Sequence, residues 1–444
     1  MKLTSLKQIA QLLGIEILND CPINGVAVDS RLVTPGNVFF ALIGEKVDGH
    51  AFLAQAAKAK ASCFVVNKSY KGDHFGLPII YVDDTTISLQ LLAQKLLSLR
   101  TSKIVAITGS VGKTTTKDFL TTILEQKYKV SKTIGNANSQ IGVPLTILNH
   151  TDGQEDVLVI EMGMNKPGQI AKLVKIAPPD IAILTHVALT HASNFKSLKN
   201  IAFEKGEIFN HPKTKIGMIN YDIENIEELM KFGTCSKVSF SLLSKGSDFY
   251  FDDYNIQTRK GEIFKLDPAL HPYFGKHHYQ NLMAAIAAAR YLDVSFEEIK
   301  RAEPLLVLPE KRFEVVEKKG VVFVNDSYNA SEISVKAALE SLPEPKKNGK
   351  KIAVIGELLE LGKYSDQCHL NVGIKALQHV DSMMLLGKGC LPIYDYWKTN
   401  KKPVELFLSR HELVESLKMK LNQGDVVLLK GSNSNQLWKI LEEV

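Results

Sequence analysis

A glycine-rich loop between an apolar run and an amphipathic run restricts the fold of this chain more than any other feature. The loop is Thr108-Gly109-Ser110-Val111-Gly112-Lys113-Thr114-Thr115, after the apolar run 103–107 and at the start of an amphipathic run that ends at Gln126. Strand, glycine loop and helix in this order turn backbone N–H groups and a helix N-terminus toward phosphates. Lys113 would then reach the β- and γ-phosphates, and the Thr114 hydroxyl would bind Mg2+. The loop predicts a site for a nucleoside triphosphate with magnesium, but not what is done with the phosphate.

The spacing of this loop departs from the common phosphate-binding pattern. That pattern has a glycine five residues before the second glycine, where this chain has Ile107. The first glycine falls at Gly109 instead, so the loop is tighter. A chance glycine loop before a helix is the alternative, but the strand and helix on both sides favour a true phosphate site.

Composition sets wide limits on the class of protein. A chain of 444 residues is too long for one core, and its length suggests about three domains. The net charge of +6 is mild and no long Lys/Arg run is present, so nucleic-acid binding has little support. The five cysteines are scattered without a C-x-x-C pair, which is typical of reduced thiols in a cytoplasmic protein. The apolar runs are too short to span a bilayer, so we expect no membrane insertion.

Apolar runs that alternate with helical patterns predict an α/β fold with parallel sheets. We expect three domains, at 1–100, 101–308 and 309–444. The first is an α/β domain, the central one is a parallel-sheet ATPase domain built on the phosphate loop, and the last is Rossmann-like. Residues 235–272 differ, being polar and β-rich, and suggest hairpins or an insertion at a sheet edge. In the last domain, functional loops should follow the carboxyl ends of the strands.

Acidic and basic residues near the predicted strand ends are candidates for the site. Glu161 ends the run VLVIE, and an acid at the tip of a parallel strand beside a phosphate loop is placed to bind Mg2+; the alternative is a solvated glutamate. His186 and His191 follow the next strand and could serve a second metal, although a lone histidine is more often structural. Lys205 lies in a predicted helix and, from composition alone, is an ordinary surface lysine.

Two polar segments at strand ends are also candidates. The amide-rich loop 135–144, with Asn138 and Ser139, could bind phosphate or sugar groups, and an ordinary turn is an equal alternative. Asp326-Ser327-Tyr328-Asn329 follows the run VVFVN, and an aspartate in such a place often binds a ribose hydroxyl.

Together these segments resemble the Mur ligase family, over essentially the whole chain. The resemblance lies in TGSVGKTT, GNANSQIGVPLT, VIEMGMN, HVALTHASNFKSLKNIAFEKGEIF, NDSYNASEISVKAAL, VIGELLELGKYSDQCH and LLKGSNS, which occur in the family's order. The tight loop, irregular for phosphate loops in general, is the family's own form.

The resemblance implies roles for individual residues. Gly109, Ser110, Val111, Gly112, Lys113, Thr114 and Thr115 match the ATP and Mg2+ loop. Glu161 matches a Mg2+ ligand, and His191 the histidine near a second Mg2+. Lys205 matches a lysine that carries a carbamate and so turns from cation to metal-binding anion, which reverses the surface interpretation. Lys113, Lys205 and His191 would then be catalytic.

Further matches concern the nucleotide and the substrates. Asn281, Arg312 and Asp326 match adenine, nucleotide and ribose contacts. Segments that recognise a UDP-sugar are matched by Asp29-Ser30-Arg31 and Asp48-Gly49-His50, which makes 1–100 the UDP-substrate domain. Asn138, Ser139, Tyr328 and Asn329 are expected to face substrate.

The resemblance implies ATP-dependent amide formation through an acyl phosphate, in cytoplasmic synthesis of peptidoglycan precursors. NDSYNA and FEKGEIF point to the last-acting ligase, whose partners are UDP-N-acetylmuramoyl-tripeptide and D-alanyl-D-alanine; we expect a monomer. Three positions depart from the family pattern: His278 replaces an asparagine, Glu357 an aspartate, and Asn433 an arginine of the acceptor side. The alternatives are another ligase of the superfamily, such as one that extends a folate, or a nucleotide-binding regulator without activity.

Overall fold

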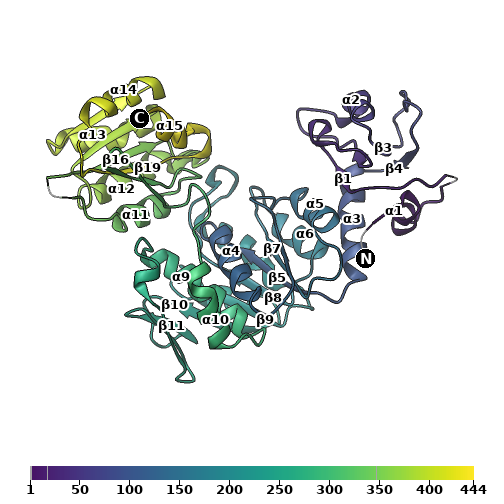
Figure 1. Ribbon diagram of the computed structural model, residues 1–444, viewed down its shortest axis with the longest axis horizontal. Helices are drawn as coiled ribbons and strands as arrows, with labels where there is room; N and C mark the ends of the chain where they lie inside the picture. The colour runs from purple at the N-terminus through teal and green to yellow at the C-terminus, as the bar shows by residue number, and fades with distance from the viewer. Residues whose placement is uncertain (1–2, 18, 347) are drawn as a thin grey trace.

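The computed structural model describes residues 3–17, 19–346 and 348–444, and these form three α/β units that follow one another along the molecule (Figure 1). Each unit has its own sheet, of four, nine and six strands. The three-domain α/β fold expected from the sequence is confirmed. Among the described residues, no helix is long and apolar enough to cross a membrane.

The first sheet is parallel throughout, in the order β1-β2-β3-β4. Its strands are β1 (Val26–Ala27), β2 (Val38–Phe40), β3 (Cys63–Asn67) and β4 (Ile79–Val82). Its helices are α1 (Leu6–Leu13), α2 (Leu53–Lys58) and α3 (Thr85–Ser98). Helix α1 begins at Ser5, whose side chain caps the first turn in a capping box, and ends at Gly14 in the left-handed conformation.

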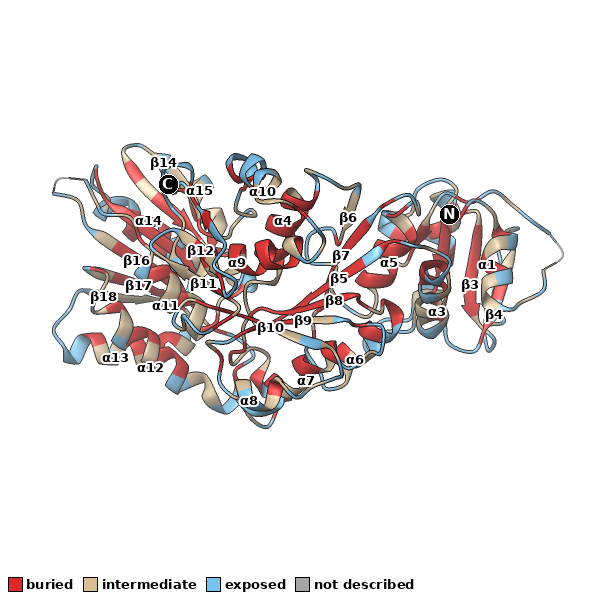
Figure 2. Ribbon diagram, turned by 90° about the horizontal axis from the view of Figure 1, so that it is seen from below, coloured by how far each residue is buried: buried red, intermediate tan, exposed pale blue. Residues whose placement is uncertain are grey.

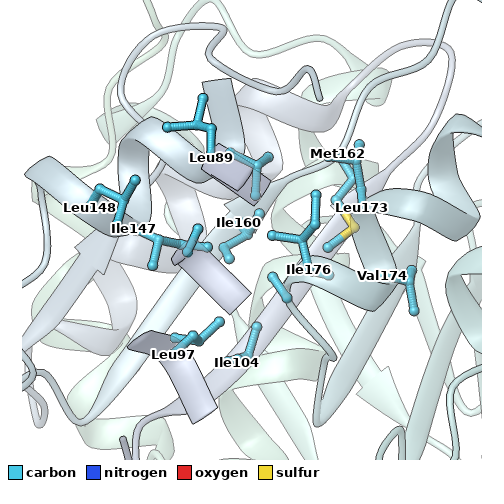
Figure 3. Packing of buried hydrophobic residues seen from close by; sticks show 14 of the residues in the cluster. Leu89, Leu97, Ile104, Ile147, Leu148, Ile160, Met162, Leu173, Val174 and Ile176 are labelled. Atoms are coloured by element: carbon cyan, nitrogen blue, oxygen red, sulfur yellow. The ribbon is translucent and has the colours of Figure 1, made fainter. Parts of the chain in front are cut away.

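Helix α3 joins the first domain to the second. Its apolar side chains, including Leu89 and Leu97, pack with the central-domain helices α5 (Gly142–Asn149) and α6 (Gln169–Ile176) and with the first central strand (Figure 3). One hydrophobic core therefore continues from the first sheet into the central one, and its burial fixes the first domain against the second.

The central sheet has the order β13-β12-β11-β10-β9-β8-β5-β7-β6. Its strands are β5 (Lys103–Thr108), β6 (Val130–Lys132), β7 (Val157–Glu161), β8 (Ile181–Leu184), β9 (Ile216–Asn220), β10 (Ser236–Ser241), β11 (Phe249–Asp252), β12 (Asn255–Thr258) and β13 (Ile263–Lys265). Strands β5 to β11 pair in parallel, whereas β11, β12 and β13 form antiparallel hairpins at the edge. The hairpins expected within 235–272 are present at 249–265, whereas Ser236–Ser241 forms the parallel strand β10.

Helices cover both faces of the central sheet. They are α4 (Lys113–Leu124), α5 (Gly142–Asn149), α6 (Gln169–Ile176), α7 (Leu198–Gly206), α8 (Ile226–Leu229), α9 (Lys276–Arg290) and α10 (Phe296–Ala302). Alternate residues of β5 face opposite layers: Ile104 packs in the core with α5 and α6, and Val105 in the core with α4 and α9. Figure 2 shows the central strands buried; helices α4 and α9 are also mostly buried, whereas α10 carries exposed residues.

The third sheet has the order β14-β15-β19-β16-β17-β18. Its strands are β14 (Glu314–Lys318), β15 (Val321–Asn325), β16 (Lys351–Gly356), β17 (Ser382–Leu386), β18 (Val404–Phe407) and β19 (Val426–Lys430). Its helices are α11 (Glu332–Glu340), α12 (Ser365–Ala376), α13 (Leu391–Thr399), α14 (Arg410–Lys420) and α15 (Ile440–Glu443). Helices α11 to α13 cover one face, and α14 and α15 the other.

Strand β14 was not expected from the sequence. It pairs antiparallel with β15 at the edge of an otherwise parallel sheet. Its run EVVEK carries three charged residues in five positions, and only one neighbouring strand supports it, so its apolar signal is weak. The chain reverses between the two strands at Lys319 and Gly320, which both have positive φ.

Candidate active site

The carboxyl ends of three neighbouring strands meet at one edge of the central sheet. Strand β5 lies between β8 and β7. The phosphate loop follows β5, Glu161 ends β7, and the segment with His191 follows β8. Parallel pairing thus brings together residues that are far apart in the sequence.

The phosphate loop is held in a tight turn. Gly112 has φ +85 and caps α4, and a Cβ there would collide with the side-chain oxygen of Asn281. A Cβ at Gly109 would collide with Thr185. The Thr185 hydroxyl also donates to the Val111 carbonyl at 2.6 Å. The loop therefore needs both glycines, and its contact with α9 sets Asn281 beside it.

Hydrogen bonds within the loop and to the segment after β8 hold the polar groups of the loop in place. The ammonium of Lys113 donates to the Gly109 carbonyl at 2.8 Å. The backbone N–H of Ser110 donates to the His186 carbonyl at 2.7 Å, and its hydroxyl to the Ala188 carbonyl at 2.8 Å. Thr115 is buried in the first turn of α4. Burial lowers the pKa of Lys113, and the Glu161 carboxylate opposes that shift.

Oxygen atoms of the kind that Mg2+ prefers lie together beneath the loop. The Thr114 hydroxyl donates to Glu161 Oε2 at 2.8 Å, and the Asn138 amide donates to Glu161 Oε1 at 2.6 Å. Glu161 is almost fully buried, so the solvated alternative is wrong. Hard oxygen ligands beside a phosphate loop fit a magnesium ion. Arg312 reaches this group from the third domain and donates to Thr114 Oγ1 at 3.0 Å.

A cavity of about 290 Å3 opens beside this cluster. Its walls include Lys113, Asn138, Ser139, His191 and Lys205. With Gly109 and Ser110, which also line it, seven of the residues proposed from the sequence, from four separate segments, share one space. Three of them are basic, so the cavity suits anionic groups.

Lys205 is not a surface residue. It lies at the end of α7 with 3% of its surface exposed. Its side-chain nitrogen has no hydrogen-bond or ion-pair partner within the part of the chain that the structure describes. Burial lowers its pKa well below the ordinary value, and the nearby charge of Lys113 lowers it further. The surface interpretation is wrong because composition cannot tell which face of a short helix is covered.

His191 joins the cavity to the third domain. Its backbone is left-handed at φ +54, and its Nδ1 contacts the carboxylate of Glu360. Burial lowers the pKa of His191, and Glu360 opposes the shift. His186, the other histidine considered, instead receives a hydrogen bond from Asn220 at 3.2 Å and lies behind the loop.

The candidates of the third domain gather next to the phosphate loop. The Arg312 guanidinium lies 4.1 Å from the centre of the Tyr328 ring. Asp326 pairs with the buried Lys430 at 2.6 Å, and Lys430 also donates to the Asn329 carbonyl at 3.0 Å. Asn433, one of the departures from the family pattern, donates to the Tyr328 carbonyl at 3.1 Å.

The candidates of the first domain lie in a separate place. Asp29 and Arg31 pair with each other at 2.6 Å, and the Ser30 hydroxyl donates to Gln55 at 2.9 Å. Asp48 holds His50 at 2.6 Å, and His50 Nε2 accepts from the N–H of Asn67 at 3.0 Å. The ring of His50 also stacks on Tyr70.

A cleft lies between the first domain and the central domain. It has a volume of about 530 Å3 and lies between residues 24–37 and the segments 134–146 and 149–150. Asp29 lines this cleft, whereas none of the other UDP-sugar candidates does. Gly49 lies against the backbone of Leu42, where a Cβ would not fit.

Two residues of the site escaped the sequence interpretation. Lys117, one turn after Lys113, is buried and donates to the carbonyls of Thr133 at 2.9 Å and Gly135 at 3.1 Å. It anchors the loop that carries Asn138. The other is Glu360, which lies in a motif that resembles the family but was assigned no role. The only indication in the sequence was that an acidic residue follows shortly after the end of a predicted strand.

Family models cover most of the chain. A Mur ligase family catalytic domain matches residues 22–92, a Mur ligase middle domain 107–289, and a Mur ligase glutamate ligase domain 311–433. The UDP-N-acetylmuramoyl-tripeptide–D-alanyl-D-alanine ligase of Bacillus subtilis (strain 168) is 32% identical over 435 residues, which are 95% of this chain and 93% of that protein.

Solved structures agree with the sequence comparison. MurF from Acinetobacter baumannii superposes with a TM-score of 0.87 at 25% identity, over 98% of this chain and 97% of the other. MurF ligase from Thermotoga maritima in complex with ADP gives a TM-score of 0.79 at 30% identity, over 95% and 96% of the two chains. The likeness extends over all three domains.

Proposed function

We propose a specific reaction for this chain, which belongs to the Mur ligase family and is an ATP-dependent amide ligase. The reaction joins D-alanyl-D-alanine to the terminal carboxylate of UDP-N-acetylmuramoyl-tripeptide, within peptidoglycan precursor synthesis. Full-length similarity to ligases of that name supports this choice of substrates. The observation that carries it is the cavity that unites Lys113, His191 and Lys205 beside the Thr114–Glu161 pair.

The reaction proceeds in two displacements. The donor carboxylate attacks the γ-phosphate of ATP, which gives an acyl phosphate and ADP. The amine of the dipeptide then attacks the acyl carbon, an amide bond forms, and the C–O bond to phosphate breaks. Because the reacting groups are mostly anionic, alignment and charge neutralisation are the protein's main tasks.

We assign these tasks to individual residues. Lys113, the N–H groups of 109–112 and the N-terminus of α4 hold the β- and γ-phosphates. Thr114 and Glu161 would hold one magnesium ion, and His191 a second; bound magnesium offsets phosphate charge. Asn281, Arg312 and Asp326 bind the nucleoside, and Tyr328 and Asn329 face substrate.

We further propose that Lys205 is carbamylated. Burial lowers the pKa of the Lys205 amine well below its ordinary value and so favours the unprotonated form, which is the form that adds CO2. The carbamate would place an anion beside Lys113 and His191, which suits a metal-binding role there.

The remaining assignments complete the proposal. The domain of residues 1–100 binds the UDP-sugar through Asp29, Ser30, Arg31, Asp48, Gly49 and His50. Residues 101–308 bind ATP, and 309–444 carry the acceptor side. We propose that the enzyme acts as a monomer in the cytoplasm, where ATP is available.

Release of phosphate across a panel of UDP-muramoyl peptides tests this function. We expect release only when ATP, a UDP-tripeptide and D-alanyl-D-alanine are all present, with the panel identifying the third residue as lysine or diaminopimelate. Equal activity with a folate and glutamate would contradict the proposed substrates. Nucleotide binding without any substrate-dependent release would indicate a regulator.

A further inference from the structure

The loop after β16 reaches from the third domain to the loop after β8. The Ser193 N–H donates to the Glu360 carbonyl at 3.0 Å, and the Glu360 carboxylate contacts His191 Nδ1. The Tyr364 hydroxyl donates to the Lys196 carbonyl at 3.2 Å. These contacts place the Glu360 carboxylate, which belongs to the third domain, at the edge of the cavity in the central domain.

Glu360 is positioned by its backbone and yet remains accessible. Its φ is +63, and that of its contact His191 is +54, a conformation that residues other than glycine seldom adopt. Such conformations persist where surrounding contacts fix them, and they are frequent at functional sites. The Glu360 side chain nevertheless keeps 60% of its surface exposed. Its carboxylate can therefore accept a further partner at the mouth of the cavity.

The charges around the cavity make this carboxylate distinctive. Lys113 lines the cavity and suits phosphate and carboxylate groups. Glu161 is already bonded to Thr114 and Asn138 on the nucleotide side. An acceptor that arrives as an ammonium ion is repelled by Lys113 and attracted by an acid of opposite charge. Glu360 supplies that charge from the domain that faces the phosphate loop.

We propose that Glu360 binds the ammonium group of the incoming dipeptide and directs its nitrogen toward the acyl carbon. This inference rests on the proposed function. One proton of the ammonium is released to solvent before attack. The nitrogen then forms the C–N bond, and the phosphate leaves with the electrons of the broken C–O bond and with the second proton. Glu360 orients the amine and takes no part in the phosphoryl transfer.

The variant Glu360→Gln tests this role because it removes the charge and keeps the shape. Loss of a charge-assisted hydrogen bond should raise KM for D-alanyl-D-alanine about tenfold or more. KM for ATP and for the UDP-tripeptide should stay within about twofold of wild type, because the proposal gives Glu360 no contact with those ligands. The matched control is Glu317→Gln, an exposed glutamate of the same domain that pairs with Lys346 at 2.7 Å. It should leave all three constants unchanged.

A second measurement separates acceptor binding from acyl phosphate formation. Hydroxylamine is an uncharged nucleophile at neutral pH and converts the acyl phosphate to a hydroxamate without D-alanyl-D-alanine. We expect Glu360→Gln to form hydroxamate at the wild-type rate. Failure of the wild-type enzyme to form any hydroxamate from the UDP-tripeptide would defeat the proposed function itself, independently of Glu360.

Other outcomes would overturn the inference alone. An unchanged KM for the dipeptide in Glu360→Gln would exclude an ammonium contact. A parallel loss of hydroxamate formation and weaker binding of all substrates would make Glu360 a docking residue. A changed magnesium requirement with normal dipeptide KM would make it part of the metal environment.

Discussion

The phosphate edge of the central domain and the contact surface of the third domain are built in different ways. At the phosphate edge, Thr114, Glu161 and Lys205 are buried, and Thr114 and Glu161 are joined by a hydrogen bond. At the contact surface, Glu360 remains largely exposed and meets its partner across two domains. Packing within the central domain fixes the residues of the first region, whereas the position of Glu360 depends on how two domains dock. Activation of the donor should therefore be more sensitive to single residues than capture of the acceptor.

Removal of Lys113 gives the largest expected effect. Lys113→Ala deletes the cation at the γ-phosphate, and we expect kcat/KM to fall by about 10^3-fold or more. The fold should survive, because the side chain lines a cavity and its bonds stay within the loop. Steady-state kinetics with a thermal melt measure both effects. Near-normal rates in a folded variant would remove the basis of the phosphate-loop assignment.

Replacement of Lys205 tests whether this buried lysine acts as a carbamate anion. We expect Lys205→Ala to lose about 10^2-fold or more in kcat, since a charged group at the reacting centre is lost. Added short-chain carboxylic acids should restore part of this activity by occupying the space of the carbamate. Absence of rescue, together with an unmodified lysine in the mass spectrum of active enzyme, would rule out the carbamate.

Replacement of Lys117 tests how far the phosphate edge depends on the hydrogen bonds of this buried lysine. Lys117→Met keeps most of the volume but leaves the Thr133 and Gly135 carbonyls unpaired, which destabilises the fold by about 1–3 kcal/mol. We also expect a roughly tenfold loss of kcat, because the loop with Asn138 loses its fixed position. Denaturant unfolding and kinetics measure the two effects. The exposed lysine variant Lys172→Met serves as control and should change neither.

The smallest expected effect concerns pH, at the place where α9 meets the third domain. Burial lowers the pKa of His277 to about 4, and the Asp326 carboxylate opposes that shift. The unfolded chain, with a histidine pKa of about 6.5, then binds more protons than the folded protein between about pH 6.5 and 4, so stability falls as the pH falls through this window.

A thermal melt series between about pH 7 and pH 5 measures this dependence. We expect the variant His277→Asn to show a shallower decline, by a few degrees in Tm. The exposed His411→Asn should keep the wild-type slope. Equal slopes in all three proteins would show that His277 contributes nothing to the dependence.

Local sequence patterns were sufficient to predict much of this molecule. The alternation of apolar runs and helices predicted three α/β units, and the strand over Val157–Glu161 was predicted to the residue. The tight phosphate loop was predicted because its glycines, lysine and threonines carry their chemistry in consecutive positions. Edge strand β14 was missed because a charged strand with one neighbour has little apolar periodicity.

Burial and long-range contact had to come from the tertiary structure. Lys205 had no distinctive neighbours in sequence, and only the packing of α7 with its neighbouring helices removes it from water. Likewise, nothing near Glu360 in the sequence indicates a contact with His191, 169 positions away. The sequence by itself determined the phosphate loop and the family, because those depend on consecutive residues. The fold decided which charges share one cavity, because that depends on strand order and domain docking.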